Sequence, residues 1–214
     1  MTPQRILGAS AIALLFATSI AIAQTPTPPA APPAPAPIRI RGEIEAVDGP
    51  MLTVKARDGS TVKIKLADNA RITAMVAASL ADIKEGSFIG VTAMPQPDGS
   101  QKAIGLHIFM DSQRGVIPTR HLPWDREPGS TMTNANVEST VASVDGQVIM
   151  VKYTDGEQKV IVPPNTPVVR FVPGNASDLK SGAKMIVIGA QSMPDGSFAA
   201  PAINVGRDGV APPM

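Results

Sequence analysis

The chain contains two copies of one short module. The stretch from Glu43 to Leu66 returns, with its residues in the same order, between Thr140 and Val162. The clearest matches lie at one offset of 97 residues: V-D-G at 47–49 and 144–146, V-K at 54–55 and 151–152, D-G at 58–59 and 155–156, and P-D-G-S at 97–100 and 194–197. Matches in this order indicate a duplicated unit, so the 214-residue chain is expected to form two small domains.

Each copy has the pattern of short, half-buried strands. Residues 52–56 and 62–66 alternate apolar and polar side chains, which is typical of strands with one buried face. Asp-Gly pairs separate these runs and favour two-residue hairpins, because both central positions of such a turn take a positive φ. Seven of the twelve aspartates precede a glycine. These carboxylates are therefore assigned to turns, where an Asp side chain caps its own backbone.

The order of these elements predicts an all-β protein. In each copy, three strands joined by hairpins precede a short helical turn and a final hairpin of two strands. Five strands with a short helix after the third favour a small OB-like barrel. We expect two tandem five-stranded antiparallel OB-like barrels, over 38–110 and 136–207, with an inter-domain loop at 111–135 and a tail at 208–214. A long parallel sheet is excluded, because the crossover helices it needs are missing.

The turn and core motifs carry a resemblance to a known family. Their order, V-D-G, D-G, L-K/D-x-G, P-D-G and I-x-V, resembles that of secreted bacterial OB-like repeats known mainly as a domain of unknown function. The resemblance covers both copies but not the loop between them. Because its motifs are turns and core positions, it implies an exported β-barrel binding or structural module and no particular activity.

The first 37 residues are expected to be an export signal and a linker. Residues 1–23 combine the basic Arg5 with an apolar run and an Ala-Ile-Ala end, the pattern of a cleavable secretory signal peptide. An uncleaved anchor is the alternative, because the apolar run is about long enough to span a bilayer. Residues 24–37 are rich in Pro and Ala, which predicts a polyproline-II linker. Export of a chain without cysteine predicts a periplasmic protein with no membrane span after cleavage.

The composition disfavours nucleic-acid binding and catalysis. The formal charge is +1, and loss of Arg5 with the signal peptide would bring it to zero, which leaves no long-range field to gather polyanions. One Trp, one Tyr and five Phe provide few rings on which bases could stack. Motifs for an activated serine, a phosphate-binding loop or an H-E-x-x-H zinc site do not occur. A non-enzymatic protein is therefore expected.

The loop between the copies carries the residues best suited to a specialised task. Its prolines predict an irregular segment, yet it holds the single Trp of the chain, Trp124, together with His121 and Met132. Imidazole and thioether groups suit Cu(I) or Ag(I) where no thiolate exists, and an indole ring can cover a cation. Just before the loop, His107 would point outward from a strand and Met110 inward. The candidate metal ligands are thus His121, Met132, His107 and Met110.

This group of residues resembles the site of periplasmic copper/silver chaperones, which combines a His, a Trp and Met residues. Those proteins carry paired methionines close after the Trp, whereas here one Met follows eight residues later. The resemblance implies a copper or silver ion as the bound cofactor.

The same loop also has a structural interpretation. Trp124 and Leu122 would fill the seam between the barrels, with Arg120 and His121 solvated at its rim. A contact with a small ligand or a protein is a third alternative. The expected function is that of an exported, non-enzymatic binding module, monomeric or weakly associating. The alternative is a structural or interaction module of the cell envelope, whose exposed strand edges accept a protein partner.

Overall fold

The alternating sequence pattern produces an all-β fold. The computed structural model describes residues 38–143 and 146–214, and the expected signal peptide and linker lie outside the described residues. The described residues form twelve strands in one hydrogen-bonded network. In chain order the strands are β1 (Ile38–Asp48), β2 (Met51–Ala56), β3 (Thr61–Ala78), β4 (Phe88–Pro95), β5 (Gln101–Ile108), β6 (Arg120–Pro123), β7 (Thr131–Ser143), β8 (Gly146–Tyr153), β9 (Gly156–Val162), β10 (Val168–Pro173), β11 (Lys184–Ser192) and β12 (Phe198–Gly206).

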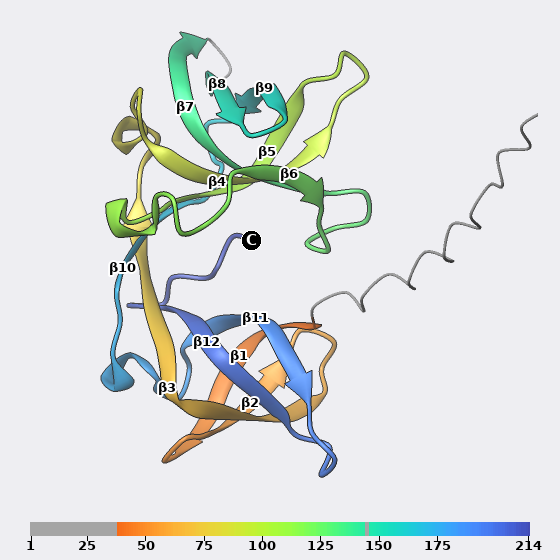
Figure 1. The fold of residues 1–214 in the computed structure, drawn as a ribbon, viewed down its shortest axis with the longest axis vertical. Coiled ribbons are helices and arrows are strands. Elements are labelled where there is room, and N and C mark those ends of the chain that lie inside the picture. Colours follow the sequence, from red (N-terminus) through yellow and green to blue (C-terminus); the bar gives the residue numbers. More distant parts are fainter. Residues whose placement is uncertain (1–37, 144–145) are drawn as a thin grey trace, which may run out of the picture. The chain divides into compact units, whose positions relative to one another are not determined.

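A five-stranded barrel forms from strands of both copies. Its order is β12-β11-β1-β2-β3, and it closes where β3 pairs with β12 in parallel (Figure 1). Three of its strands belong to the first copy, whereas β11 and β12 are the last hairpin of the second. Leu52 and Val54 of β2 and Ile64 of β3 are fully buried, which confirms the alternation predicted for these two strands.

Five of the seven remaining strands form a second set that repeats this order. β4 and β5 pair with each other, β4 pairs with β7, and β5 pairs in parallel with β9. The resulting order, β5-β4-β7-β8-β9, is called the second strand set below. It combines three strands of the second copy with the last hairpin of the first. The two copies have therefore exchanged their final hairpins.

This exchange corrects the expected domain organisation. Neither 38–110 nor 136–207 supplies all five strands of one set, and the described residues fall within one compact unit. The cause is the length of β3, which runs unbroken for 18 residues and so spans up to roughly 60 Å. It carries the chain away from the first three strands before the β4–β5 hairpin begins. The pairs β3–β12 and β5–β9 are parallel, so neither set is purely antiparallel, in contrast to the expected antiparallel barrels.

In the second copy, prolines interrupt the strand that corresponds to β3. The positions that align with the middle of β3 are Pro163, Pro164 and Pro167, and proline cannot donate a backbone hydrogen bond to a neighbouring strand. The long strand is therefore split into β9 and β10. β10 pairs with β3 on one side and with β5 on the other, so it links the barrel to the second strand set.

Single turns of 3-10 helix occupy the connections that lead to the exchanged hairpins, at Leu80–Asp82 and Ala176–Asp178. In each turn the aspartate side chain accepts a hydrogen bond from a backbone N–H three residues earlier, at 2.9 Å. A third turn lies at Asp111–Gln113. In the part of the chain that the structure describes, no helix is long and apolar enough to cross a membrane.

The segment between the copies is more regular than its prolines predict. β6 forms within it and pairs with the beginning of β7, which starts at Thr131 rather than at 136. Pro123 is tolerated because β6 pairs on one side only, and an edge strand can dispense with donors on its open side. The prediction of an irregular loop over 111–135 is therefore corrected.

Three hydrophobic clusters stabilise the fold. One lies inside the barrel and one inside the second strand set. The third, which we call the seam cluster, draws residues from β3 and β11 of the barrel and from β4 and β7 of the second set. Its buried members are Met75, Phe88, Phe109, Met132, Val169, Phe171, Ile186 and Met214. The candidate site lies beside this cluster.

Candidate functional site

The two candidate ligands on β6 and β7 face opposite sides of the sheet. His121 lies directly across from Thr133, and Leu122 lies across from Met132. Residues across an antiparallel pair share a face, whereas neighbours along a strand alternate. His121 Nδ1 is 2.8 Å from Thr133 Oγ1, while Met132 is buried in the seam cluster. The structure therefore does not bring the imidazole of His121 and the thioether of Met132 together.

His107 is buried, which corrects the expectation that it points outward. It is only 3% exposed, because Phe171 of the neighbouring strand β10 and Phe109 cover its ring. The ring stacks on Phe171 with centroids 4.8 Å apart and meets Phe109 edge-on at 4.6 Å. Gly90 makes room for it, since a Cβ there would lie 2.0 Å from His107 Cε1. Burial lowers the pKa of His107 to about 3, so the ring is neutral at pH 7.

Met110 and Trp124 pack against the seam cluster and are partly buried. Met132, inside the cluster, has the Thr92 hydroxyl 4.0 Å from its sulfur. Because the cluster draws on both sets of strands, the indole of Trp124 lies at the junction between them. Leu122, on β6, is also partly buried, but it does not belong to the seam cluster.

Trp124 also faces two arginines that the sequence motifs did not indicate. The guanidinium carbon of Arg39 lies 4.0 Å from the centroid of the Trp124 ring, and that of Arg41 lies 5.8 Å from it. Both distances fall within the range of cation–π attraction. The sequence feature that could have indicated these arginines is the alternation Ile-Arg-Ile-Arg at 38–41. In a strand, this pattern sends the isoleucines to one face and the arginines to the other.

Both arginines meet the carboxylate of Asp125. Arg41 donates from Nη1 and Nη2 to the two carboxylate oxygens, at 3.1 and 2.7 Å, which is the two-pronged geometry of a strong ion pair. Arg39 Nη1 lies 3.7 Å from Oδ1 of the same group. Arg41 also donates from Nε to the backbone oxygen of Met214 at 2.9 Å. The guanidinium of Arg41 is thus held on two sides.

The loop 124–130 presents Trp124 and Asp125 to these arginines. Its ends are joined by the backbone N–H of Trp124, which donates to the oxygen of Ser130 at 2.7 Å. The buried hydroxyl of Ser130 accepts a hydrogen bond from Glu127 N at 3.1 Å and donates to Glu127 O at 2.7 Å. These bonds fix the loop backbone and leave the Asp125 side chain 46% exposed.

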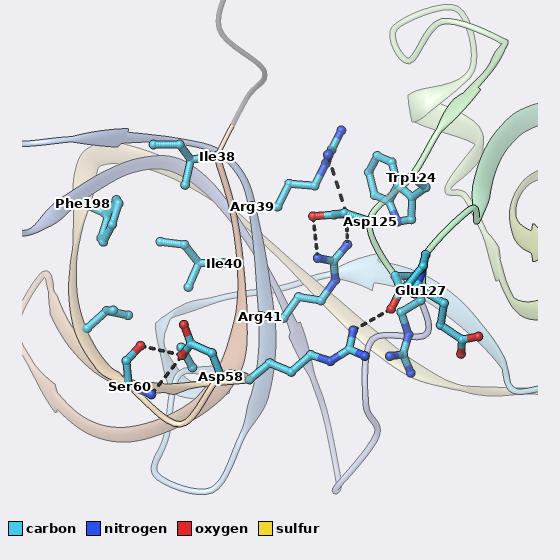
Figure 2. Close-up of a pocket in the computed structure, with 15 residues that line it drawn as sticks. Ile38, Arg39, Ile40, Arg41, Asp58, Ser60, Trp124, Asp125, Glu127 and Phe198 are labelled. Carbon is cyan, nitrogen blue, oxygen red and sulfur yellow. Dashed lines mark hydrogen bonds and ion pairs between the residues drawn. The ribbon is translucent and has the colours of Figure 1, made fainter.

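A cleft of about 770 Å³ opens where this loop meets β1. Ile38, Ile40 and Phe198 lie on the barrel side of β1, and Arg39 and Arg41 lie on the side that faces the loop (Figure 2). β1 supplies both sides because its side chains alternate. On the side of the arginines, the apolar residues that line the cleft are Trp124 and Pro128.

Positive charge exceeds negative charge in the cleft lining, which contains four arginines (Arg39, Arg41, Arg57 and Arg126) and three acids (Asp58, Asp125 and Glu127). Asp58 is engaged in its own turn, where it accepts hydrogen bonds from Ser60 N at 2.9 Å and Ser60 Oγ at 2.6 Å. Arg57 donates from Nη1 to the backbone oxygen of Arg126 at 2.7 Å. Asp125 is therefore the carboxylate that Arg39 and Arg41 share.

The pKa shifts of Arg39 and Asp125 agree with the excess of positive charge in the cleft lining. Burial lowers the pKa of Arg39; the charge of Asp125 opposes that effect, while the charges of Arg41 and Arg120 add to it. Arg120, which is exposed on β6, thus contributes to the positive field. Burial by itself raises the pKa of Asp125, but the hydrogen bond and charge of Arg41, together with Arg39, outweigh it and bring that pKa below its usual value.

No protein-family model matches the chain, and neither the curated proteins nor the solved structures contain a match. The resemblances to secreted OB-like repeats and to copper/silver chaperones therefore rest on sequence motifs alone. The function is inferred from the geometry of the cleft.

Proposed function

We propose that this protein is an exported, non-enzymatic binding module of the periplasm. We further propose that the cleft beside Trp124 binds a small molecule with an anionic group and an apolar body. One observation carries this proposal: the guanidinium groups of Arg39 and Arg41 share the carboxylate of Asp125, and the charge of Arg120 also acts on Arg39. Like charges this close repel one another unless anions balance them. The signal-peptide pattern of residues 1–23 supports export.

The proposed architecture is a pair of OB-like barrels with exchanged hairpins. In its support, both sets have the same strand order, and in both the third strand of one copy pairs in parallel with the last strand of the other. A five-stranded barrel of the OB type commonly binds ligands on its outer surface and connecting loops. The cleft lies on such a surface, between β1 and a loop.

The hydrogen-bonding groups of the cleft favour an acceptor-rich ligand. Arginine presents a planar fork of donors that matches carboxylate and phosphate oxygens. In addition, Arg39 Nε and Trp124 Nε1 are buried donors that find no acceptor among the described residues. A buried donor without an acceptor costs about 1–3 kcal/mol. Both donors belong to the stacked pair of Arg39 and Trp124, beside the carboxylate of Asp125.

The size and lining of the cleft favour a small organic ligand. Pockets for small molecules measure roughly 300–1,000 Å³ and are mostly apolar, with a few polar groups that orient the ligand. The cleft falls within that range, and Trp124 and Pro128 provide apolar surface on the side of the arginines.

Titration of the protein with phenylacetate tests this proposal, with the neutral phenylacetamide as the control ligand. Trp124 is the single Trp of the chain, so its fluorescence reports directly on the cleft. We expect a saturable change with phenylacetate and none with phenylacetamide. Arg39→Gln should weaken the response, whereas Arg71→Gln, at an exposed arginine outside the lining, should not. A response that the amide reproduces, or the lack of any response, contradicts the proposal.

The two alternatives derived from the sequence have less geometric support. A copper or silver site would have to join His121 and Met132, which face opposite sides of β6 and β7, or reach His107 among its aromatic neighbours. Addition of a partner strand would need an open edge. Among the described strands only β6, with four residues, pairs on one side alone.

A further inference from the structure

Asp125 occupies the position that a ligand's anionic group would need. Its two oxygens take both Nη donors of Arg41, and Oδ1 is the atom nearest to Arg39 Nη1. We propose that the ligand of the cleft is an organic carboxylate and that the Asp125 side chain is its internal competitor. The ligand's carboxylate replaces that of Asp125 between Arg41 and Arg39. This inference rests on the proposed function of the cleft.

The two arginines keep their places when Asp125 leaves. Arg41 remains bound through Nε to the Met214 backbone oxygen at 2.9 Å. Arg39 remains stacked over the Trp124 ring at 4.0 Å. Their side chains are only 13% and 15% exposed, so little conformational freedom has to be lost on binding. A site ordered in advance binds more tightly for the same contacts.

Asp125 can leave the arginines by rotation of its side chain. Its side chain is 46% exposed, so rotation about its own bonds brings the carboxylate into water. The backbone need not move, because the hydrogen bonds of Ser130 hold the ends of the loop together. The two-pronged pair with Arg41 is lost when Asp125 leaves, but the incoming carboxylate forms the same pair. The exchange therefore replaces one carboxylate by another.

The geometry favours a carboxylate with an apolar substituent. Arg41 binds a planar two-oxygen group with one oxygen on each Nη, at 3.1 and 2.7 Å, and an incoming carboxylate reproduces this arrangement. An apolar substituent can then pack on the same side of β1 against Trp124 and Pro128, which also line the cleft. Burial of that substituent provides the gain that Asp125 cannot offer, because Asp125 has no apolar body.

Removal of the competitor tests the inference. In the full chain, Asp125→Asn keeps the shape of the side chain but removes its charge, and we expect phenylacetate to bind about tenfold more tightly by calorimetry. Glu127→Gln is the matched control, because it removes one negative charge from the same lining without vacating Arg41. Its affinity for phenylacetate should change by less than about twofold. If Asp125→Asn does not fold, Asp125→Ser serves the same purpose.

The outcomes separate the inference from the proposed function. If phenylacetate binds the unsubstituted protein and both variants equally, the cleft binds anions but Asp125 is not a competitor. Equal gains in Asp125→Asn and Glu127→Gln would mean that net charge alone controls affinity, which also overturns the inference. Tighter binding of phenylphosphate than of phenylacetate to Asp125→Asn would refute the carboxylate preference. If no probe binds any of the three proteins, the proposed function itself fails.

Discussion

The guanidinium of Arg39 lies over the indole ring of Trp124, 4.0 Å from its centroid. This contact joins β1 of the barrel to the loop 124–130, which lies between the two copies. Arg39 is mostly buried, and burial lowers its pKa, yet an arginine remains charged at pH 7. The charge therefore faces the ring with little competing water, a situation that strengthens cation–π attraction.

Replacing Arg39 by methionine should remove this attraction while keeping an apolar chain against Trp124. We expect Arg39→Met to lower the free energy of unfolding by about 1 kcal/mol and to alter the emission of Trp124. Chemical denaturation followed by fluorescence measures both effects. Arg71→Met, at an exposed position on β3, should stay within about 0.5 kcal/mol of the unsubstituted protein. An equal loss in the two variants would show that the stacked contact adds no stability.

Gly90 should not tolerate a side chain. A Cβ at this position would lie 2.0 Å from Cε1 and 2.1 Å from Nε2 of His107, so the imidazole would have to leave its stack on Phe171. Overpacking of this kind costs about 1–3 kcal/mol. Thermal unfolding should show this loss for Gly90→Ala. Gly156→Ala, whose Cβ would meet its nearest neighbour at 3.4 Å, is the control.

A second substitution identifies His107 as the obstacle to Gly90→Ala. In the Gly90→Ala/His107→Ala protein, the added methyl group no longer meets the ring. The cost of Gly90→Ala should therefore be smaller in the His107→Ala background than in the unsubstituted protein. Identical costs in the two backgrounds would place the conflict elsewhere.

His107 should make the protein less stable in mild acid. Its pKa is about 3 in the folded state, because burial disfavours the charged ring, and about 6.5 when unfolded. Between these values the unfolded chain binds a proton that the folded chain does not, so stability falls as the pH is lowered from about 6.5 towards 3. The slope from this one group approaches 1.4 kcal/mol per pH unit.

Comparison with His107→Leu isolates this contribution. Turn aspartates such as Asp58 and Asp98, whose pKa values are lowered by hydrogen bonds from nearby serines, also favour neutral pH. Their effect is common to both proteins and cancels in the difference. Urea denaturation at pH 7 and pH 5 should show a smaller loss on acidification for His107→Leu. A loss of the same size in both would mean that His107 takes up its proton without unfolding.

The exchange of hairpins should keep the chain together after it is cut between the copies. Val116 is 68% exposed, so a protease recognition sequence inserted after Gly115 should be accessible. The hairpin of each fragment completes the strand set of the other, so we expect the two fragments to elute together under native conditions and to unfold in one transition. Uncut protein with the same insertion is the control. Fragments that separate and remain folded would argue for two independent barrels.

Local features of the chain were predictable from its sequence. Asp58, Asp98 and Asp195 accept hydrogen bonds from the serine two residues later, as expected of Asp-Gly turns. These interactions depend on residues within two or three positions of one another, so they are visible in the order of residues. The alternation in β2 and β3 was equally readable, because a strand with one buried face imposes a period of two.

The site was much less predictable. Trp124 was singled out from the sequence as unusual, but its partners Arg39 and Asp125 were not, because nothing in the Ile-Arg alternation of β1 shows which segment will face it. His107 was expected at the surface, since the alternation of one strand cannot reveal that a second layer covers its outer face. The aromatic rings of Phe171 and Phe109, which belong to the seam cluster, provide that cover.

The sequence alone determined the repeat, the turns and the alternation of the strands, because each depends on spacing along the chain. Only the tertiary structure decided which hairpin completes which set of strands. The two copies share one hydrophobic pattern, so a strand edge of either copy offers the same backbone donors and acceptors to both hairpins. The length of β3 selects between them, since it carries the first hairpin beyond the reach of its own barrel and brings it beside β7.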